Sequence, residues 1–103
     1  MGFLEFIFGK KKDDVHKLLN EGAIILDVRT QREWDNGHIE DSTHIPLDQL
    51  KDRLSEIEQL NKPIITVCES GVRSLKAAKF LILNNINAIN GGGWKSLNKT
   101  IAR

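Results

Sequence analysis

The sequence contains only one cysteine, and this scarcity excludes several kinds of protein. A single thiol cannot form an internal disulfide, so nothing in the 103 residues points to an oxidising compartment. It also cannot complete a thiolate metal site, and the histidines at positions 16, 38 and 44 do not cluster at any metal-ligand spacing. We therefore expect no metal, no other cofactor and a cytoplasmic location.

Charge of one sign and long apolar runs are missing as well. The net charge of +1 gives no concentrated basic face, which a nucleic-acid partner would require. No run approaches the roughly 20 apolar residues needed to span a bilayer. With 40% hydrophobic and 28% charged residues over a length that suits one domain, the composition is that of an ordinary globular protein.

The beginning of the chain differs from the rest in composition. Residues 3–8 are mostly apolar, and lysines follow at residues 10–12. No positive charge precedes the apolar part, which is also too short for a secretory signal. We divide the chain into an apolar and basic arm, residues 1–12, and a single domain, residues 13–103. For the arm we favour packing against the domain or a partner over a membrane-surface anchor formed by residues 3–8.

Predicted strands and helices alternate along the domain. Nearly continuous apolar runs predict parallel strands buried on both faces, over residues 23–28, 64–67 and 86–89. Capping residues and apolar residues spaced three or four apart predict helices, over residues 13–21, 30–34, 47–60, 74–83 and 94–100. This alternation predicts an α/β fold, a small parallel β-sheet with helices on both faces.

Individual residues predict several local features. Thr30 is expected to cap a helix, with Glu33 as its capping-box partner. Residues 44–46 are expected to be extended, because the residue before a proline avoids the helical region. Arg29 and Glu33 are expected to form a local ion pair. Residues 91–93, which are all glycine, are expected to form a tight loop.

The stretch from Cys68 to Ser74 carries the strongest chemical signal. Cys68 comes directly after a buried strand, and a helix is predicted to begin at Ser74, so the thiol is expected at the mouth of the sheet. Gly71 allows a positive φ that turns backbone N–H groups inward, while Arg73 and the positive end of the helix add positive potential. These groups stabilise a thiolate, which is the reactive form of cysteine.

Cys68 alone would be interpreted as a small buried apolar residue that ends a strand. The glycine, arginine and serine that follow it reverse this interpretation, because together they offer a lowered pKa, access and an anion-binding loop. No histidine follows closely to act as a base, so the loop fits a thiolate that accepts sulfur better than a cysteine protease. Asp27 interrupts the first apolar strand, where a buried carboxylate needs partners.

These motifs resemble those of a single-domain rhodanese, the sulfurtransferase homology domain, over about residues 13–97. The stretch from Cys68 to Ser74 is similar to the family's active loop, in which Cys, two variable residues and Gly are followed by one variable residue, Arg and Ser. Further matching segments occur in the family's order, namely Asp27-Val28-Arg29, Glu33-Trp34, Gly37-His38-Ile39, Ile45-Pro46-Leu47 and Gly92-Gly93-Trp94.

The resemblance implies sulfur transfer. Cys68 would take a sulfane sulfur from thiosulfate or a persulfide, hold it as a persulfide and pass it to a thiol or cyanide. Arg73 would be the second catalytic residue. The substrate would be bound by residues of the loop and of the neighbouring strand, namely Glu69, Ser70, Gly71, Val72, Ser74, Asp27 and Arg29. The partners would be a small-molecule or protein sulfur donor and the acceptor, with the chain as a monomer or weak dimer.

Two alternatives to this enzyme stay open. One is a non-catalytic binding or sulfur-carrier module with the same fold. The other is a small phosphatase or arsenate reductase, which the resemblance disfavours, because Cys68 to Arg73 spans six residues and the related phosphatases carry one more. Glu69 departs from a purely cationic loop. Its carboxylate is expected to raise the pKa of Cys68 and to repel dianions, so we prefer a persulfide donor to thiosulfate.

Overall fold

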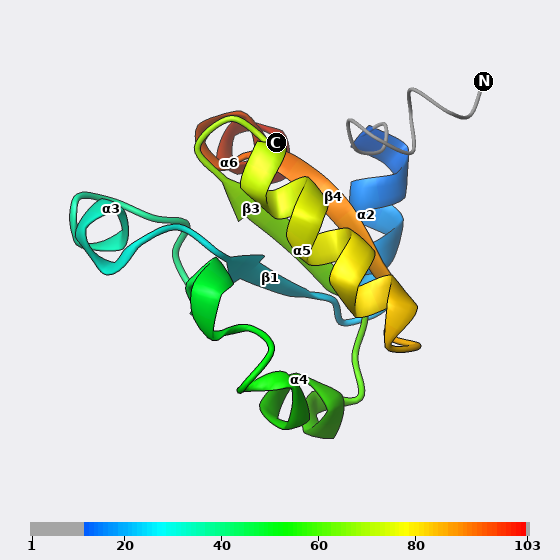
Figure 1. Ribbon diagram of the computed structural model, residues 1–103. Coiled ribbons are helices and arrows are strands. Elements are labelled where there is room, and N and C mark those ends of the chain that lie inside the picture. Colours follow the sequence, from blue (N-terminus) through cyan, green and yellow to red (C-terminus); the bar gives the residue numbers. More distant parts are fainter. Residues whose placement is uncertain (1–11, 103) are drawn as a thin grey trace.

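Four parallel strands form one sheet with helices on both faces, in a computed structural model that describes residues 12–102 (Figure 1). The α/β architecture is therefore as predicted. The predicted arm, residues 1–12, lies outside the described residues except for Lys12. In chain order the elements are α2 (Lys12–Asn20), β1 (Ile24–Asp27), α3 (Gln31–Asp35), β2 (Thr43–His44), η1 (Leu47–Gln49), α4 (Leu54–Leu60), β3 (Ile64–Cys68), α5 (Val72–Leu83), β4 (Ala88–Gly93) and α6 (Trp94–Ile101).

The order of strands in the sheet is β2-β1-β3-β4, which places β3 in the interior of the sheet. Its register pairs Asp27 with Val67 and Cys68 with Gly93. The carboxyl ends of β1, β3 and β4 therefore lie at one edge of the sheet. Open α/β sheets place their ligand sites at this edge.

Every residue of β3 is buried, because helices cover the sheet on both sides. Successive side chains of a strand point to opposite faces. Ile64 and Cys68 pack on the face that α4 and α5 cover, together with Leu81 of α5. Ile65 and Val67 pack on the face that α2 and α6 cover. A strand buried on both faces explains why its sequence is a continuous apolar run instead of an alternating one.

The predicted single helix over residues 47–60 is wrong. The chain forms the short 3₁₀ helix η1, then a turn, and then α4. Bonds from Gln49 N to Pro46 O and from Leu50 N to Leu47 O tighten the first part. The apolar spacing could not reveal this break, because residues three apart share a face in a 3₁₀ turn as well as in an α-helix.

The predicted tight loop over residues 91–93 is also wrong, because β4 continues through these glycines. A β-carbon at Gly91 would lie 2.7 Å from the side chain of Ile65 and 2.8 Å from the carbonyl oxygen of Thr66. The register between β3 and β4 shifts between Thr66 and Cys68, and Gly92 has a φ of +84°. Gly91 therefore allows close packing of β4 against β3, and Gly92 allows the irregular backbone where the register shifts. Neither glycine forms a turn between elements.

Candidate active site

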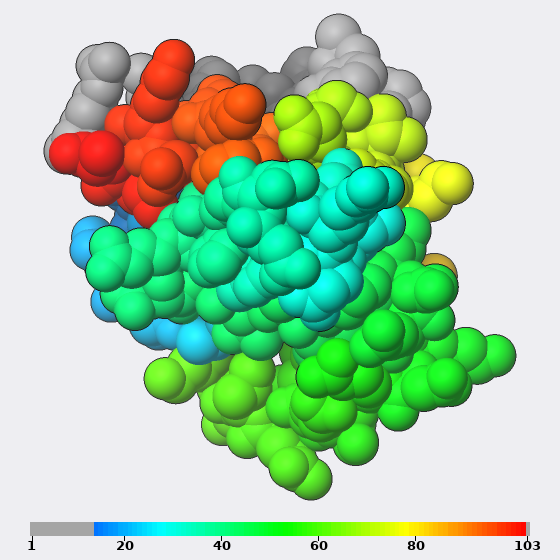
Figure 2. Space-filling model, turned by 90° about the vertical axis from the view of Figure 1, so that its left-hand side faces the viewer, coloured from blue at the N-terminus to red at the C-terminus, as the bar shows by residue number. Residues whose placement is uncertain are grey.

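The loop after β3 lies at the carboxyl edge of the sheet, where three segments distant in sequence meet. Figure 2 views the molecule from the side on which α3 lies, with residues 30–45 in cyan to green at the centre. Arg73 at the start of α5 contacts Glu33 of α3, and Gly37 lies against the ring of Trp94 at the start of α6. The three segments thus meet beside the loop that carries Cys68.

Backbone donors converge on this sulfur. The N–H groups of Gly71 and Ser74 donate to Cys68 Sγ at 3.0 and 3.3 Å. Gly71 has a φ of +103°, the left-handed conformation that the sequence predicted, and α5 begins directly after it at Val72 instead of at Ser74. The loop therefore folds back over its own cysteine, and the positive end of α5 points at the thiol.

The environment lowers the pKa of Cys68 below its ordinary value. Burial of the thiol raises the pKa, but hydrogen bonds from the Ser74 side chain and from the N–H groups of Ser74, Gly71 and Ser70 lower it by more. The net shift is a decrease, opposite in direction to the rise that we expected from Glu69. A thiolate therefore forms more readily here than at an ordinary cysteine, without a neighbouring base.

Asn90 completes a buried network that the sequence analysis missed. The thiol of Cys68 donates to Ser74 Oγ at 3.3 Å, and the Ser74 hydroxyl donates to Asn90 Oδ1 at 2.6 Å. Asn90 Nδ2 in turn donates to the carbonyl of Gly71 at 3.1 Å. The signal was a polar residue directly after the predicted strand and directly before the glycines.

Arg73 does not point at the sulfur. Its Nη1 and Nη2 donate to the two carboxylate oxygens of Glu33 at 2.7 and 2.9 Å, and no hydrogen bond joins it to Cys68 among the described residues. The predicted pair of Arg29 with Glu33 is therefore wrong. The bond to Arg73 is the main reason why the pKa of Glu33 falls to about 2. Glu33 also makes the predicted capping box with Thr30.

Arg29 pairs instead with Asp27, two residues before it. Arg29 Nη2 donates to Asp27 Oδ2 at 2.8 Å and to the carbonyl of Gly37 at 2.7 Å, and Arg29 Nε donates to Asp27 Oδ1 at 2.9 Å. The side chains are only 2% and 0% exposed, so the pair is structural and gives the buried carboxylate the partners it needs. The guanidinium also lies 4.6 Å from the ring centroid of Trp94.

The other predicted binding residues differ in exposure. Glu69, Ser70 and Val72 lie exposed on the rim of the loop, whereas Gly71 and Ser74 face the sulfur. Cys68 itself is only 1% exposed, so access to the thiol is narrower than the sequence predicted.

The histidines have structural contacts away from the sulfur. The ring of His38 stacks on Trp34 with centroids 3.5 Å apart, and its Nδ1 lies 2.8 Å from the Trp34 carbonyl. His44 lies on Trp34 at 4.7 Å and bonds the carbonyl of Arg29.

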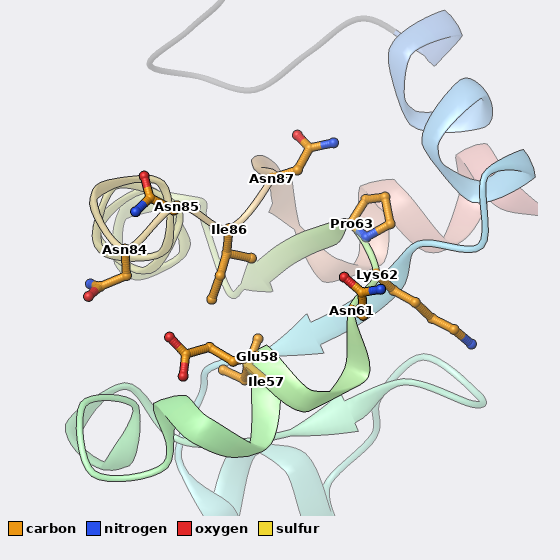
Figure 3. A pocket seen from close by; sticks show the side chains of 9 residues that line it. All are labelled: Ile57, Glu58, Asn61, Lys62, Pro63, Asn84, Asn85, Ile86 and Asn87. Atoms are coloured by element: carbon orange, nitrogen blue, oxygen red, sulfur yellow. The ribbon is translucent and has the colours of Figure 1, made fainter.

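An open cleft of about 600 Å³ lies at the opposite end of the sheet, between the loops that precede β3 and β4 (Figure 3). Asparagines line much of it, with Glu58 and Lys62, and no cysteine, serine or histidine side chain reaches it. Among the described residues, the cleft therefore offers no thiol, hydroxyl or imidazole for catalysis.

Two features are absent from residues 12–102. No group of three or more His, Cys, Asp or Glu side chains in this range could hold a metal ion. None of the helices there is long and apolar enough to cross a membrane.

Comparison with known proteins identifies relatives of the chain. The rhodanese-like domain family matches residues 11–100. Uncharacterized protein YqhL of Bacillus subtilis is 41% identical over 75 residues, which cover 71% of this chain and 59% of that protein. This chain thus spans less than two thirds of that relative's length. Thiosulfate sulfurtransferase GlpE of Pseudomonas syringae is 30% identical over 83 residues, which cover 78% of this chain and 77% of that enzyme.

Solved structures agree with this assignment. The crystal structure of a rhodanese-like domain protein from Staphylococcus aureus has 34% sequence identity and a TM-score of 0.70, and the match covers 84% of this chain and 86% of that one. The family match and the relatives named thiosulfate sulfurtransferase support, at the level of the family, that this chain is a sulfurtransferase-like enzyme. By its fold, its cysteine loop and this match over most of its length, the chain belongs to the rhodanese-like domain family.

Proposed function

We propose that this chain is a sulfurtransferase that carries a sulfane sulfur on Cys68. The observation that carries the proposal is the convergence of N–H donors on the sulfur, at 3.0 Å from Gly71 and 3.3 Å from Ser74. Such donors stabilise a thiolate first and then the anionic outer sulfur of a persulfide. The relative in Pseudomonas syringae bears the name thiosulfate sulfurtransferase, which agrees in kind.

The proposed reaction has two steps. The Cys68 thiolate attacks the outer sulfur of thiosulfate, the S–S bond of the donor breaks, and sulfite leaves with the bonding electron pair. With a persulfide donor, a thiolate leaves in the same way. The acceptor, cyanide or a thiolate, then attacks the outer sulfur of the Cys68 persulfide, and Cys68 leaves as the thiolate. No net oxidation of the protein occurs, because the sulfur is transferred with its oxidation state unchanged in each step.

Arg73 has a positioning role in this proposal. Its guanidinium is bound by both oxygens of Glu33, so its contribution at the sulfur is a nearby positive charge and not a direct bond. Arg29, which is paired with Asp27, holds the carbonyl of Gly37 and thereby the segment after α3. The residues proposed to touch the transferred sulfur are the loop members Ser70, Gly71 and Ser74.

The size of the loop supports sulfur as the cargo. Cys68 to Arg73 spans six residues, and the thiol is only 1% exposed. The related phosphatases carry one more residue in this loop, which makes room for a phosphate, so we propose that the shorter loop carries a single sulfur atom. A phosphoryl group has three outer oxygens and requires more space and more donors.

Thiocyanate production tests the proposal. Wild-type protein given thiosulfate or a persulfide donor with cyanide is expected to release thiocyanate, and Cys68→Ser is expected to release none above background. Ser96→Ala, on the exposed side of α6, is the matched control for an effect of substitution alone. Equal turnover by wild type and Cys68→Ser would exclude a role for the thiol.

A further inference from the structure

The carboxylate of Glu69 is held at the rim of the cysteine loop. Its Oε1 accepts a long hydrogen bond of 3.4 Å from Trp94 Nε1 and lies 3.8 Å from Arg29 Nη1. Its backbone carbonyl lies against Gly93, where a β-carbon would come within 2.9 Å of that oxygen. The side chain is 53% exposed, and these contacts place its charge at the rim of the loop that holds Cys68.

The two guanidinium groups beside the cysteine loop, those of Arg73 and Arg29, are already paired with carboxylates. Glu33 binds Arg73 through two bonds of 2.7 and 2.9 Å, and Asp27 binds Arg29 at 2.8 Å. Glu69 shares Arg29 only at the longer distance of 3.8 Å. Two guanidinium groups and three carboxylates leave one negative charge in excess, before the thiolate itself is counted.

Lys95 adds a weaker positive contribution. Its Nζ lies 5.8 Å from the ring centroid of Trp94, and the side chain is exposed. Solvent and salt screen an exposed charge more strongly than a buried one. The approach to the thiol is therefore not a cationic funnel, although a dianionic substrate would need one to offset its repulsion from the thiolate.

We propose that Glu69 is a specificity-determining residue that disfavours dianionic sulfur donors such as thiosulfate and favours persulfide donors whose remaining part is neutral or cationic. This inference rests on the proposed function, because it names the donor class for the same thiol. In the favoured step the Cys68 thiolate attacks the terminal sulfur of a donor R–S–SH. The donor's S–S bond breaks, R–S⁻ leaves with the electron pair, and Cys68 carries S–SH with the donor's proton.

The test compares two donors of opposite charge on the same protein. The rate of sulfur addition to Cys68 is followed by intact mass at low ionic strength, with thiosulfate and with cysteamine persulfide. Replacing the carboxylate by a neutral amide in Glu69→Gln is expected to raise the ratio of the thiosulfate rate constant to the cysteamine persulfide rate constant by about tenfold. The ratio cancels any change in the reactivity of Cys68 itself.

Glu69→Asp is the matched control, because it keeps the charge and changes the size. Its ratio is expected to stay close to that of the wild type, and the effect of Glu69→Gln is expected to shrink at high salt. If both donors add sulfur and the ratio of their rate constants is the same in wild type, Glu69→Gln and Glu69→Asp, the proposed role of Glu69 is overturned. The proposed function would stand in that case. A rise of this ratio in Glu69→Asp as large as that in Glu69→Gln would also overturn the role of Glu69, because the charge would then not be the cause. No addition to wild type from either donor would overturn the proposed function and this inference with it.

Discussion

Ser74 links the thiol of Cys68 to the interior of the fold. Its hydroxyl and its N–H group both lie 3.3 Å from the sulfur, and its hydroxyl also donates to Asn90. The Ser74 side chain is among the groups that lower the pKa of Cys68 against the effect of burial, which raises it. When the thiol loses its proton, the hydroxyl can turn to donate to the thiolate.

Ser74→Ala should therefore make the thiol less acidic. The pKa of Cys68 is expected to rise, because burial remains and one stabilising donor is lost. At neutral pH a smaller fraction is then thiolate, so alkylation by iodoacetamide should slow by about fivefold. The measurement is the pH profile of the alkylation rate, with Ser96→Ala as the control. An unchanged profile would show that the hydroxyl does not stabilise the thiolate.

The pairing of charged side chains is the part of the site that the sequence predicted least accurately. The family resemblance placed Asp27 and Arg29 beside the cysteine loop, but Arg29 was assigned to the wrong carboxylate, and the pair of Arg73 with Glu33 was not predicted. Asp27 lies two residues from Arg29 on the same buried stretch, whereas Glu33 reaches Arg73 across 40 residues of sequence. Such a choice depends on side-chain directions that only the packing of α3 against α5 determines.

At the scale of elements, α3 connects to the cysteine loop through one ion pair. Glu33 is 31% exposed and Arg73 is 34% exposed, so water screens part of their attraction. Bonds from Arg73 are the main cause that lowers the pKa of Glu33 from 4.5 to about 2. A carboxyl group with a lowered pKa stabilises the folded state above its unfolded pKa, and this stabilisation is lost as the pH falls through the folded value.

Glu33→Gln should thus destabilise the protein by about 1 kcal/mol near neutral pH. Glutamine can still serve the capping box with Thr30, so the substitution removes mainly the ion pair. The difference in urea unfolding free energy between the two proteins is expected to shrink as the pH falls from 4.5 toward 2. Glu56→Gln, which removes the exposed pair with Arg53, is the control and should have a smaller effect. A difference that does not depend on pH would contradict the assignment.

The elements themselves were largely predictable, with errors of one kind. The buried strand β3 was predictable because its sequence is a continuous apolar run, and the start of α3 was predictable from Thr30 and Glu33. The errors over residues 47–60 and 91–93 arose because one local pattern suits two conformations. A three-residue apolar spacing fits 3₁₀ and α turns, and glycine fits a loop or a close strand contact. Tertiary packing decides between them.

At the scale of the whole molecule, stability depends on two cores that share one sheet. Leu81 of α5 is 0% exposed in the core on the α4 and α5 face, while Leu83 at the end of the same helix is 82% exposed. Leu81→Ala should cost about 2–5 kcal/mol of unfolding free energy, because it removes buried apolar surface and leaves a cavity. Leu83→Ala is the matched control, with an expected change under about 0.5 kcal/mol. Equal losses in urea denaturation would contradict the burial of Leu81.

The central claim concerns the whole protein and its single thiol. The most direct test is the intact mass of the protein after exposure to thiosulfate and to persulfide donors. We predict that wild type gains the mass of one sulfur atom, that a reducing thiol or cyanide removes it, and that Cys68→Ser gains none. A wild-type protein that remains folded and gains no sulfur from any donor would contradict the account.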